Sequence, residues 1–502
     1  MMFSKILVAN RGEIALRVMR SCREMGIDTV AVFSEADRTA PHVLFADEAY
    51  LLGPSPSHQS YLLQEKIISI ARQSGAEAIH PGYGFLSENT DFATKVENAG
   101  ITFIGPPASA IETMGDKTKA RKAMLKSKVP VVPGTEEAIQ DVQAAMAIAE
   151  SIGFPVLIKA AGGGGGKGMR IVAASGEFLH AVETAQREAH SSFSDSRVYM
   201  EKYLEEPHHI EFQILADTQG NIIHLNEREC SIQRRYQKVI EEAPSPFIDD
   251  GIRQEMGAAA VEAARSCNYI GAGTVEFLVD KHRQFYFLEM NTRLQVEHPI
   301  TEMTTGVDLV AEQIKIAAGL PLSMTQEEIS INGHAIECRI YAEDSMSDFT
   351  PSTGEISFIQ IPDGPGTRFD GAIRSGMQVT PYYDPLLGKL ICWAGNRNTA
   401  ISRCERALRE FYIVGIDTTI QFCRTVLRHP QFQAGHYDTH FYSSHADELK
   451  KSSLVRPEDV QEVTGGTYYY HQEKLKVSGT QKKEDKDSKS NWFRSQQLGS
   501  IQ

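Results

Sequence analysis

The chain has 502 residues, which exceeds the usual size of a single hydrophobic core, so we expect several domains. Its 51 Lys and Arg residues against 65 Asp and Glu residues give a formal net charge of −14, so it lacks the basic surface typical of proteins that bind nucleic acids. No apolar run approaches the roughly 18–20 residues of a transmembrane helix, and we therefore expect no membrane partner.

The first hundred residues alternate short apolar runs with helical patterns. Residues 6–9 are a strand candidate, apolar side chains recur at helical spacing from Ile14 to Met25, and Gly26 ends that helix. Residues 30–33 then resume an extended pattern. Two later runs are strand candidates as well: residues 78–79 and 103–104. This order predicts a βαβ opening with a parallel sheet.

Five consecutive glycines, residues 162–166, lie between the apolar runs 156–158 and 169–172. Such a backbone can approach phosphates closely, and Lys159 adds positive charge beside it. The segment is not a P-loop, because Gly168 stands where Ser or Thr should follow the lysine. A flap that covers phosphates and a plain flexible linker both remain compatible with the glycine run.

Two strand-like segments, residues 273–280 and 284–291, are joined by a tight turn. If Asp280 pairs with Phe285, Glu276 lies directly opposite Glu289 on the same face of the hairpin. Opposed like charges destabilise a sheet, so an arrangement that tolerates them usually supplies a cation. Oxygen ligands alone suit magnesium.

Beyond this hairpin, polar residues alternate with mainly apolar ones along the chain. At a period of two, one side of a continuing strand carries all of the following: Glu289, Asn291, Arg293, Gln295 and Glu297. A solvated strand face would explain the alternation as well. The mixture of metal-type ligands, a guanidinium and a further carboxylate, in a segment flanked by apolar residues, favours a functional site.

Several long motifs follow these segments in order: HPGYGFLSEN, GGGGGKGMR, EKYLEEPHHIE, RRYQKVIEEAPSP, EMNTRLQVEHPITEMTTGVDLV, GHAIECRIYAED and PYYDPLLGKLI. Together they resemble the biotin carboxylase branch of the ATP-grasp superfamily, found in acetyl-CoA carboxylase and in related acyl-CoA or pyruvate carboxylases. The resemblance extends from about residue 3 to about residue 445.

The resemblance implies an ATP-grasp fold of mixed α/β and α+β class. Its expected parts are a Rossmann-like N-terminal domain (residues 1–115), a glycine-loop lid domain with its linker (116–204) and an α+β C-terminal domain (205–447). Residues 448–502 form a C-terminal extension, whose charged sequence predicts disorder from about residue 471.

The resemblance also implies roles for individual residues. The positions matched to ATP binding are Lys117, Lys159, Gly165, Gly166, Glu201, Lys202, Leu204, His209, Gln233, Glu276 and Glu289. The metal ligands are matched to Glu276, Glu289 and Asn291. The bicarbonate site is matched to Lys238, Arg293, Gln295, Val296 and Glu297, with Val296 contributing its backbone. Arg339 is matched to biotin binding, and the catalytic set is Arg293, Glu297, Lys238 and Arg339.

Tyr236 departs from the family pattern, because many relatives carry histidine at this position near the nucleotide. A tyrosine can still donate a hydrogen bond, but no contact is assigned to it.

The activity implied by the resemblance is that of a ligase that forms a carbon–nitrogen bond. It carboxylates biotin with ATP and bicarbonate through carboxyphosphate, the first half-reaction of enzymes such as the acetyl-CoA carboxylase of fatty acid biosynthesis. The implied metal is Mg²⁺ or Mn²⁺. The implied partners are a biotin carboxyl carrier protein, a carboxyltransferase subunit that chooses the acyl-CoA or keto acid, and a second copy in a homodimer. The chain has no Met-Lys-Met acceptor sequence, so we expect the biotin on a separate carrier.

Two other functions remain open. Another ATP-grasp ligase, such as a carbamoyl-phosphate or purine-pathway carboxylation enzyme, would share the lid and the hairpin but not residues 293–297 together with Arg339. A nucleotide-binding regulatory subunit without catalysis would be favoured by loss of Glu289, Arg293 or Glu297, and the sequence retains all three.

The seven cysteines are scattered and contain no pair with metal-binding spacing. No signal-type apolar region and no Arg-rich presequence come before the first strand candidate. Free cysteines are typical of a reducing compartment, and we therefore expect a cytoplasmic protein.

Overall fold

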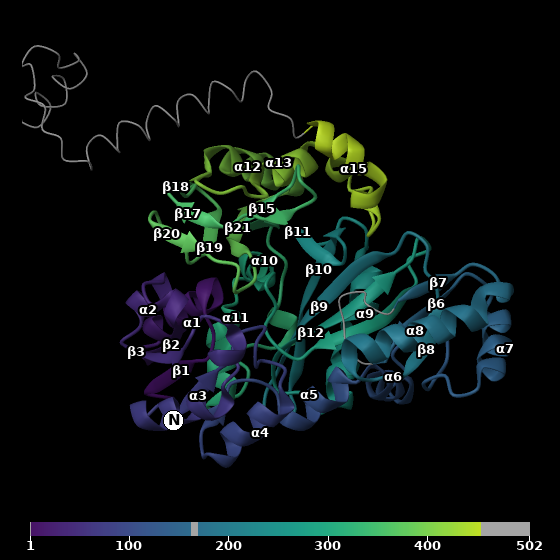
Figure 1. Ribbon diagram of the computed structural model, residues 1–502, viewed down its shortest axis with the longest axis horizontal. Coiled ribbons are helices and arrows are strands. Elements are labelled where there is room, and N and C mark those ends of the chain that lie inside the picture. Colours follow the sequence, from purple (N-terminus) through teal and green to yellow (C-terminus); the bar gives the residue numbers. More distant parts are fainter. Residues whose placement is uncertain (1, 162–168, 453–502) are drawn as a thin grey trace, which may run out of the picture. The chain divides into compact units, whose positions relative to one another are not determined.

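The computed structural model describes residues 2–161 and 169–452 (Figure 1). The predicted ATP ligands Gly165 and Gly166, and the disorder predicted from about residue 471, therefore lie outside the described residues. The described residues belong to one compact unit. The three domains proposed within this unit stay a prediction, although its three largest sheets fall into the three predicted segments.

The N-terminal segment contains a five-stranded parallel sheet in the order β3-β2-β1-β4-β5. Its strands are β1 (Lys5–Val8), β2 (Asp28–Ser34), β3 (Glu48–Gly53), β4 (Ala78–His80) and β5 (Thr102–Phe103). The accompanying helices are α1 (Gly12–Glu24), α2 (Pro41–Phe45), α3 (Gln64–Ser74), α4 (Thr90–Asn98) and α5 (Ala108–Gly115). The predicted βαβ opening is confirmed. Gly26 follows α1 with a φ of 70°, a conformation that glycine adopts without strain.

The lid segment is a three-stranded antiparallel sheet in the order β7-β6-β8. Its elements are α6 (Lys117–Lys126), α7 (Val142–Ile152), β6 (Val156–Ala160), β7 (Arg170–Val172), α8 (Phe178–Phe193) and β8 (Val198–Lys202). The apolar faces of α7 and α8 pack on this sheet in a small core of their own. The apolar runs on either side of the glycines form strands, because β6 ends at Ala160 and β7 begins at Arg170.

The remaining segment is built on an eight-stranded antiparallel sheet in the order β13-β12-β9-β10-β11-β14-β21-β19. Its strands are β9 (His208–Ala216), β10 (Ile222–Arg234), β11 (Gln237–Ala243), β12 (Gly271–Val279), β13 (Phe285–Asn291), β14 (His334–Tyr341), β19 (Thr367–Gly371) and β21 (Leu386–Ala394). Every residue of β9 and of β14 is buried, and this includes the charged side chains that these two central strands carry.

The two faces of the large sheet pack against different partners. Phe212 and Ile214 of β9 join the core formed with α9 (Asp250–Ser266), whereas Leu215 joins Ile6 and Ile14 of the N-terminal segment. Neighbouring residues of a strand point to opposite faces, which explains the division. The N-terminal sheet and the large sheet therefore share a hydrophobic core.

Helices and short strands complete the segment after α9. The helices are α10 (His298–Thr305), α11 (Leu309–Ala317), α12 (Arg397–Glu410), α13 (Ile420–Arg428), α14 (Pro430–Ala434) and α15 (Phe441–Ser452). Three small strand pairs are β15 (Glu343–Asp344) with β16 (Thr350–Pro351), β17 (Gly354–Ile356) with β20 (Met377–Val379), and β18 (Phe358–Gln360) with β22 (Tyr412–Val414). Within residues 2–161 and 169–452, no helix combines the length and the apolar character needed to cross a membrane.

Candidate active site

The predicted carboxylate pair lies on the hairpin of β12 and β13, and Glu276 is paired in register with Glu289. The pairing predicted next to the turn is wrong, because Phe285 pairs with Val279 and not with Asp280. A register shift between Glu276 and Phe277 corrects the difference of one residue. A β-bulge of this kind therefore places the two carboxylates opposite each other.

The predicted continuation of β13 through Glu297 is also wrong. The strand ends at Asn291, and the following residues form a loop that leads into α10. Pro299 lies in the first turn of α10, a position that suits the fixed φ of proline, and Glu297 is the N-cap residue. The side chain of Glu297 makes no capping hydrogen bond, so its carboxylate is available to other partners near the positive end of the helix.

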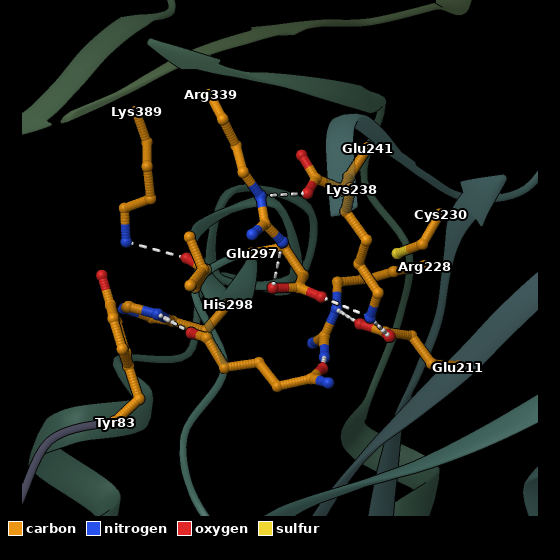
Figure 2. A network of polar contacts seen from close by, with 12 residues as sticks. Tyr83, Glu211, Arg228, Cys230, Lys238, Glu241, Glu297, His298, Arg339 and Lys389 are labelled. Carbon is orange, nitrogen blue, oxygen red and sulfur yellow. Dashed lines mark hydrogen bonds and ion pairs between the residues drawn. The ribbon is translucent and has the colours of Figure 1, made fainter. Parts of the chain in front are cut away.

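Lys238 on β11 is the centre of the network that these elements bring together (Figure 2). Its Nζ donates to Glu211 at 2.5 Å, to Glu297 at 2.7 Å and to Glu276 at 3.0 Å. Burial alone would lower the pKa of this ammonium, but the surrounding carboxylates raise it well above its usual range. Lys238 is therefore charged at neutral pH, with three carboxylates around it.

Arg339 on β14 approaches Glu297 from the other side. Its Nη2 donates to Glu297 at 2.9 Å, and its Nε donates to Glu241 at 2.5 Å (Figure 2). Burial opposes ionisation of Glu297, but the charges of Lys238 and Arg339 outweigh it and hold the pKa of this carboxyl well below its usual range. For Glu241, burial dominates over Arg339 and raises the pKa to about 7.

Arg228 on β10 is a fully buried guanidinium that the sequence analysis missed. Its Nε donates to Glu211 at 2.6 Å, and its Nη2 donates to the side-chain carbonyl of Gln295 at 2.6 Å. Gln295 in turn donates from its amide to Glu276 at 2.7 Å. Arg228 therefore joins the loop after β13 to the strands that carry Glu211 and Glu276.

The residues predicted to hold a metal fit a divalent cation with oxygen ligands. Asn291 donates its amide to Glu276 at 2.8 Å, which leaves its side-chain oxygen to face Arg293 at 2.9 Å. Burial and the nearby charge of Glu276 raise the pKa of Glu289, so the two carboxyls repel each other. The ammonium of Lys117 lies 4.0 Å from Glu289. A bound cation would relieve this repulsion.

A cavity of about 240 Å³ adjoins the hairpin on the lid side. Its lining brings together four of the predicted nucleotide and metal ligands: Lys117, Glu201, Glu289 and Asn291. Glu201 accepts from Lys159 at 2.6 Å and from Arg121 at 3.2 Å, so two buried cations share one carboxylate there. Such an excess of positive charge suits phosphate groups.

The remaining predicted ATP ligands lie around this arrangement. His209 Nε2 is 3.0 Å from Glu276, and the amide of Gln233 lies 3.1 Å from His209 Nδ1. The ammonium of Lys202 donates to the backbone carbonyls of Gly153 and Phe154 at 2.9 and 3.1 Å. Leu204 is partly exposed just beyond β8.

A second cavity, of about 490 Å³, lies on the other side of the loop after β13. Arg293, Val296 and Arg339 line it together with Tyr83 and Asp384. Three of the residues predicted for bicarbonate and biotin therefore line this cavity, whereas Lys238, Gln295 and Glu297 do not.

The residues that the sequence analysis missed are single charged positions in buried strands or helix starts: Glu13, Glu211, Arg228, Glu241 and Lys389. Alternation within a strand was a usable signal for Glu211, because it stands among the apolar residues of β9. For the others the partner comes from a distant strand, so only the sheet order reveals the pairing.

Family models match most of the chain. Residues 2–111 match the model of the biotin carboxylase N-terminal domain, and residues 337–444 match that of the biotin carboxylase C-terminal domain. Residues 116–325 match the model of the ATP-binding domain of the carbamoyl-phosphate synthase L chain.

Similar proteins carry related names. A pyruvate carboxylase subunit from Methanothermobacter thermautotrophicus is 55% identical over 441 residues, which cover 88% of this chain and 89% of that protein. Biotin carboxylase of Nostoc sp. is also 55% identical and is covered to 99%. The biotin carboxylase domain dimer of Hydrogenobacter thermophilus 2-oxoglutarate carboxylase, solved with MgADP, ADP and bicarbonate, is 48% identical. It superposes with a TM-score of 0.85 over 89% of this chain and 99% of that chain.

Proposed function

The chain belongs to the biotin carboxylase family, and from this premise we propose that it uses ATP and bicarbonate to carboxylate biotin held on a separate carrier protein. The observation that carries the proposal is the position of Glu297. Its carboxylate lies between Lys238 at 2.7 Å and Arg339 at 2.9 Å. The cavity beside this loop is lined by Arg293 and Arg339, and Arg339 contacts Glu297, so an anion bound beside these cations would lie near the base.

Bicarbonate needs a base, because it must lose a proton to attack the γ-phosphorus of ATP. In this proposal Glu297 takes that proton, while Arg293 and Lys238 hold the anion and Gln295 and the backbone of Val296 complete its site. Glu297 is ionised at neutral pH, which a base must be. An anion bound at Lys238 would withdraw part of the positive charge that Glu297 now feels, and would thereby raise the pKa of the base.

On the nucleotide side, Lys117 and Lys159 are proposed to bind phosphate oxygens, with Glu201, Lys202, Leu204, His209 and Gln233 around the base and ribose. Glu276, Glu289 and Asn291 would hold Mg²⁺ or Mn²⁺, which neutralises charge on the phosphates when bound. The residues of the chain supply position and electrostatics, which account for most of the catalysis in phosphoryl transfer.

Carboxyphosphate then releases carbon dioxide and phosphate, and the phosphate takes the proton of the biotin ureido group. Arg339 is proposed to stabilise the enolate-like oxygen that results. It is well placed, because it lines the cavity on the opposite side of the loop from the nucleotide cavity. Its guanidinium keeps a fixed direction through the hydrogen bond to Glu241.

The proposal includes a wider setting. The carboxyl group would pass from the carrier to a carboxyltransferase subunit, as in acetyl-CoA carboxylase of fatty acid biosynthesis, and the chain would act as a homodimer in the cytoplasm. The dimeric state of the Hydrogenobacter relative supports the homodimer. All seven cysteines are buried free thiols, which supports a reducing compartment.

Another ATP-grasp ligase is the second candidate, because residues 116–325 match the model named for carbamoyl-phosphate synthase. The matches at both ends of the chain, and the position of Arg339 beside Glu297, favour biotin carboxylation over it.

The test is ATP hydrolysis by the purified chain, measured with and without bicarbonate and then with added free biotin. The proposal predicts hydrolysis that requires bicarbonate and increases with biotin. Hydrolysis that ignores both, or that requires ammonia or glutamine, would contradict it. A streptavidin blot of the chain from biotin-supplied cells should give no signal, since the carrier is separate.

A further inference from the structure

Two buried basic side chains hold the backbone of the loop that carries Arg293 and Glu297. Lys389 on β21 donates from Nζ to the carbonyl oxygen of Val296 at 2.8 Å. His298, the first residue of α10, has its Nδ1 at 2.8 Å from the carbonyl oxygen of Gln295. A carbonyl only accepts, so the His298 nitrogen donates. Figure 2 shows both side chains with these two contacts as dashed lines.

These contacts fix the two peptide groups on either side of Val296. The group that contains the Gln295 carbonyl also contains the N–H of Val296, and the group that contains the Val296 carbonyl also contains the N–H of Glu297. Because a peptide group is planar, fixing its carbonyl fixes the direction of its N–H. Lys389 and His298 together therefore set the direction of the Val296 N–H and the start of the Glu297 side chain.

The position of Lys389 demands a counter-ion. Its side chain is 0% exposed, and a buried ammonium is costly unless it is paired. Glu13 supplies the charge, with its Oε1 at 3.2 Å from Nζ. The hydroxyl of Tyr83 donates to the same oxygen, and the other oxygen of Glu13 is buried with no hydrogen-bond partner among the described residues.

Glu13 and Tyr83 belong to the N-terminal segment, whereas Lys389 belongs to the large sheet. The charge that keeps Lys389 in place at the bicarbonate loop therefore comes from helix α1 of the N-terminal segment. This makes the orientation of the loop depend on the packing of the two segments, and gives both residues a reason to be buried beside a site they do not enter.

We propose that Lys389, with Glu13 as its counter-ion, is a positioning residue that orients the Val296–Glu297 peptide so that the Glu297 carboxylate faces bound bicarbonate. This inference rests on the proposed function for its catalytic consequence, but not for its structural one. The competing explanation is that Lys389 and Glu13 form an ion pair that only stabilises the packing of α1 against β21.

Three variants separate these explanations: Lys389→Met, Glu13→Gln and the double variant. Each single change leaves one buried group without its partner and should lower the melting temperature, whereas removal of both members of a buried pair is often close to neutral. The double variant should recover most of the melting temperature. Its bicarbonate-dependent kcat should nevertheless stay about 100-fold below that of the wild type, with the KM for ATP unchanged, because misplacement of a reacting group costs rate and not nucleotide affinity.

Recovery of kcat together with the melting temperature would overturn the positioning role. Arg397→Met combined with Glu242→Gln is the matched control. Arg397 pairs with Glu242 at 2.7 and 2.9 Å, and the other recorded partners of the two side chains lie outside residues 292–298, so this variant should leave both kinetics and the loop unchanged.

Hydrogen exchange read by mass spectrometry over residues 292–298 tests the structural part independently of activity. The double variant should exchange faster in this peptide than the wild type and the control. If it does not fold, Glu13→Gln alone, which preserves volume, should show the same direction of change. Unchanged exchange would overturn this inference. A wild type without bicarbonate-dependent hydrolysis, but with the exchange difference, would instead overturn the proposed function.

Discussion

Lys159 in the lid and Lys238 in the large sheet are both buried ammonium groups in the candidate site, but their surroundings are opposite. Lys159 shares the single carboxylate of Glu201 with Arg121, whereas Lys238 contacts three carboxylates, Glu211, Glu276 and Glu297. At Glu201 two cations therefore share one carboxylate. The sheet side has more negative charge close to its lysine.

This difference suggests a division of tasks. A local excess of positive charge is ready to receive a polyphosphate without further change. The carboxylates around Lys238 supply the negative charge that a metal ion needs, whereas the positive charge of Lys238 lowers the pKa of Glu276 and of Glu297 and so holds both carboxyls ionised. In the proposed reaction, two lysines that look equivalent in the sequence would therefore have different roles.

The largest effect is expected for Lys238→Met. It removes the cation that three carboxylates share: Arg228 still pairs with Glu211 and Arg339 with Glu297, but Glu276 keeps no lysine or arginine partner among the described residues. Removal of one partner from a buried pair costs about 3–5 kcal/mol of stability. Urea unfolding at pH 7 measures the loss, and bicarbonate-dependent hydrolysis should fall to background. A stability within about 1 kcal/mol of the wild type would show that Lys238 is not the centre of this charge cluster.

Arg339→Ala refines the comparison, because it separates two steps that are both assigned to the sheet side: carboxylation of biotin and cleavage of ATP with bicarbonate. Removing one charge-stabilising group commonly costs on the order of 3 kcal/mol in the barrier. Carboxylation of biotin should therefore fall about 100-fold or more, while bicarbonate-dependent ATP cleavage without biotin should fall less. Rates of both half-reactions, measured on the same preparation, decide the matter. Equal losses would move Arg339 from the biotin step to the nucleotide or bicarbonate site.

Lys159→Met is the counterpart on the lid side. Arg121 still pairs with Glu201 in this variant, so no carboxylate is left alone and the stability should fall by only about 1–2 kcal/mol. The affinity for ATP should fall at least about tenfold, because a phosphate loses its cation. Equilibrium binding of ATP measures the loss of affinity, and unfolding of the ligand-free protein measures the loss of stability. A loss of stability as large as that of Lys238→Met would contradict the proposed difference between Lys159 and Lys238.

The smallest expected effect is on the pH dependence of stability. Burial opposes ionisation of Glu276 and Glu297, but Lys238 and its neighbours outweigh it and lower both pKa values. Carboxyls with lowered pKa values stabilise the fold above their unfolded pKa of about 4.3, and this contribution is lost as the pH falls through the folded values.

Between pH 7 and pH 4, the two groups should together account for about 1–2 kcal/mol of lost stability in the wild type. Lys159→Met should lose the same amount, whereas Lys238→Met, which lacks the charge that lowers both pKa values, should lose less. Urea unfolding of the three proteins at both pH values makes the comparison. Parallel losses in all three would show that Lys238 does not set these pKa values.

The sequence was sufficient for features that depend on local pattern. The first strand and the first helix follow from the periodicity of the apolar residues near the N-terminus. The end of that helix follows from Gly26, because glycine adopts conformations that other residues avoid. Opposition of Glu276 and Glu289 was also predicted, but the turn pairing that supported it was wrong. The bulge near Glu276 restores the register, and a sequence pattern does not indicate where one strand gains a residue over its partner.

Features that depend on distant partners could not be predicted. The strand expected through Glu297 ends at Asn291, and α10 begins at His298, with Pro299 in its first turn. The side chains of Gln295 and Glu297 still reach Glu276 and Lys238 from the loop between these elements. Arg228 and Lys389 resemble ordinary strand residues in the sequence. Only the order of strands in the large sheet brings them to this loop.

Transfer of labelled carboxyl from bicarbonate to biotin on an added carrier domain tests the central claim most directly. The account predicts that the purified chain labels the carrier only when ATP, Mg²⁺ and bicarbonate are all present. Glu297→Gln should bind ATP normally but label the carrier at least about 100-fold more slowly, because an amide cannot take the proton of bicarbonate. Near-normal labelling by Glu297→Gln, or ATP cleavage by the wild type without any label on biotin, would contradict it.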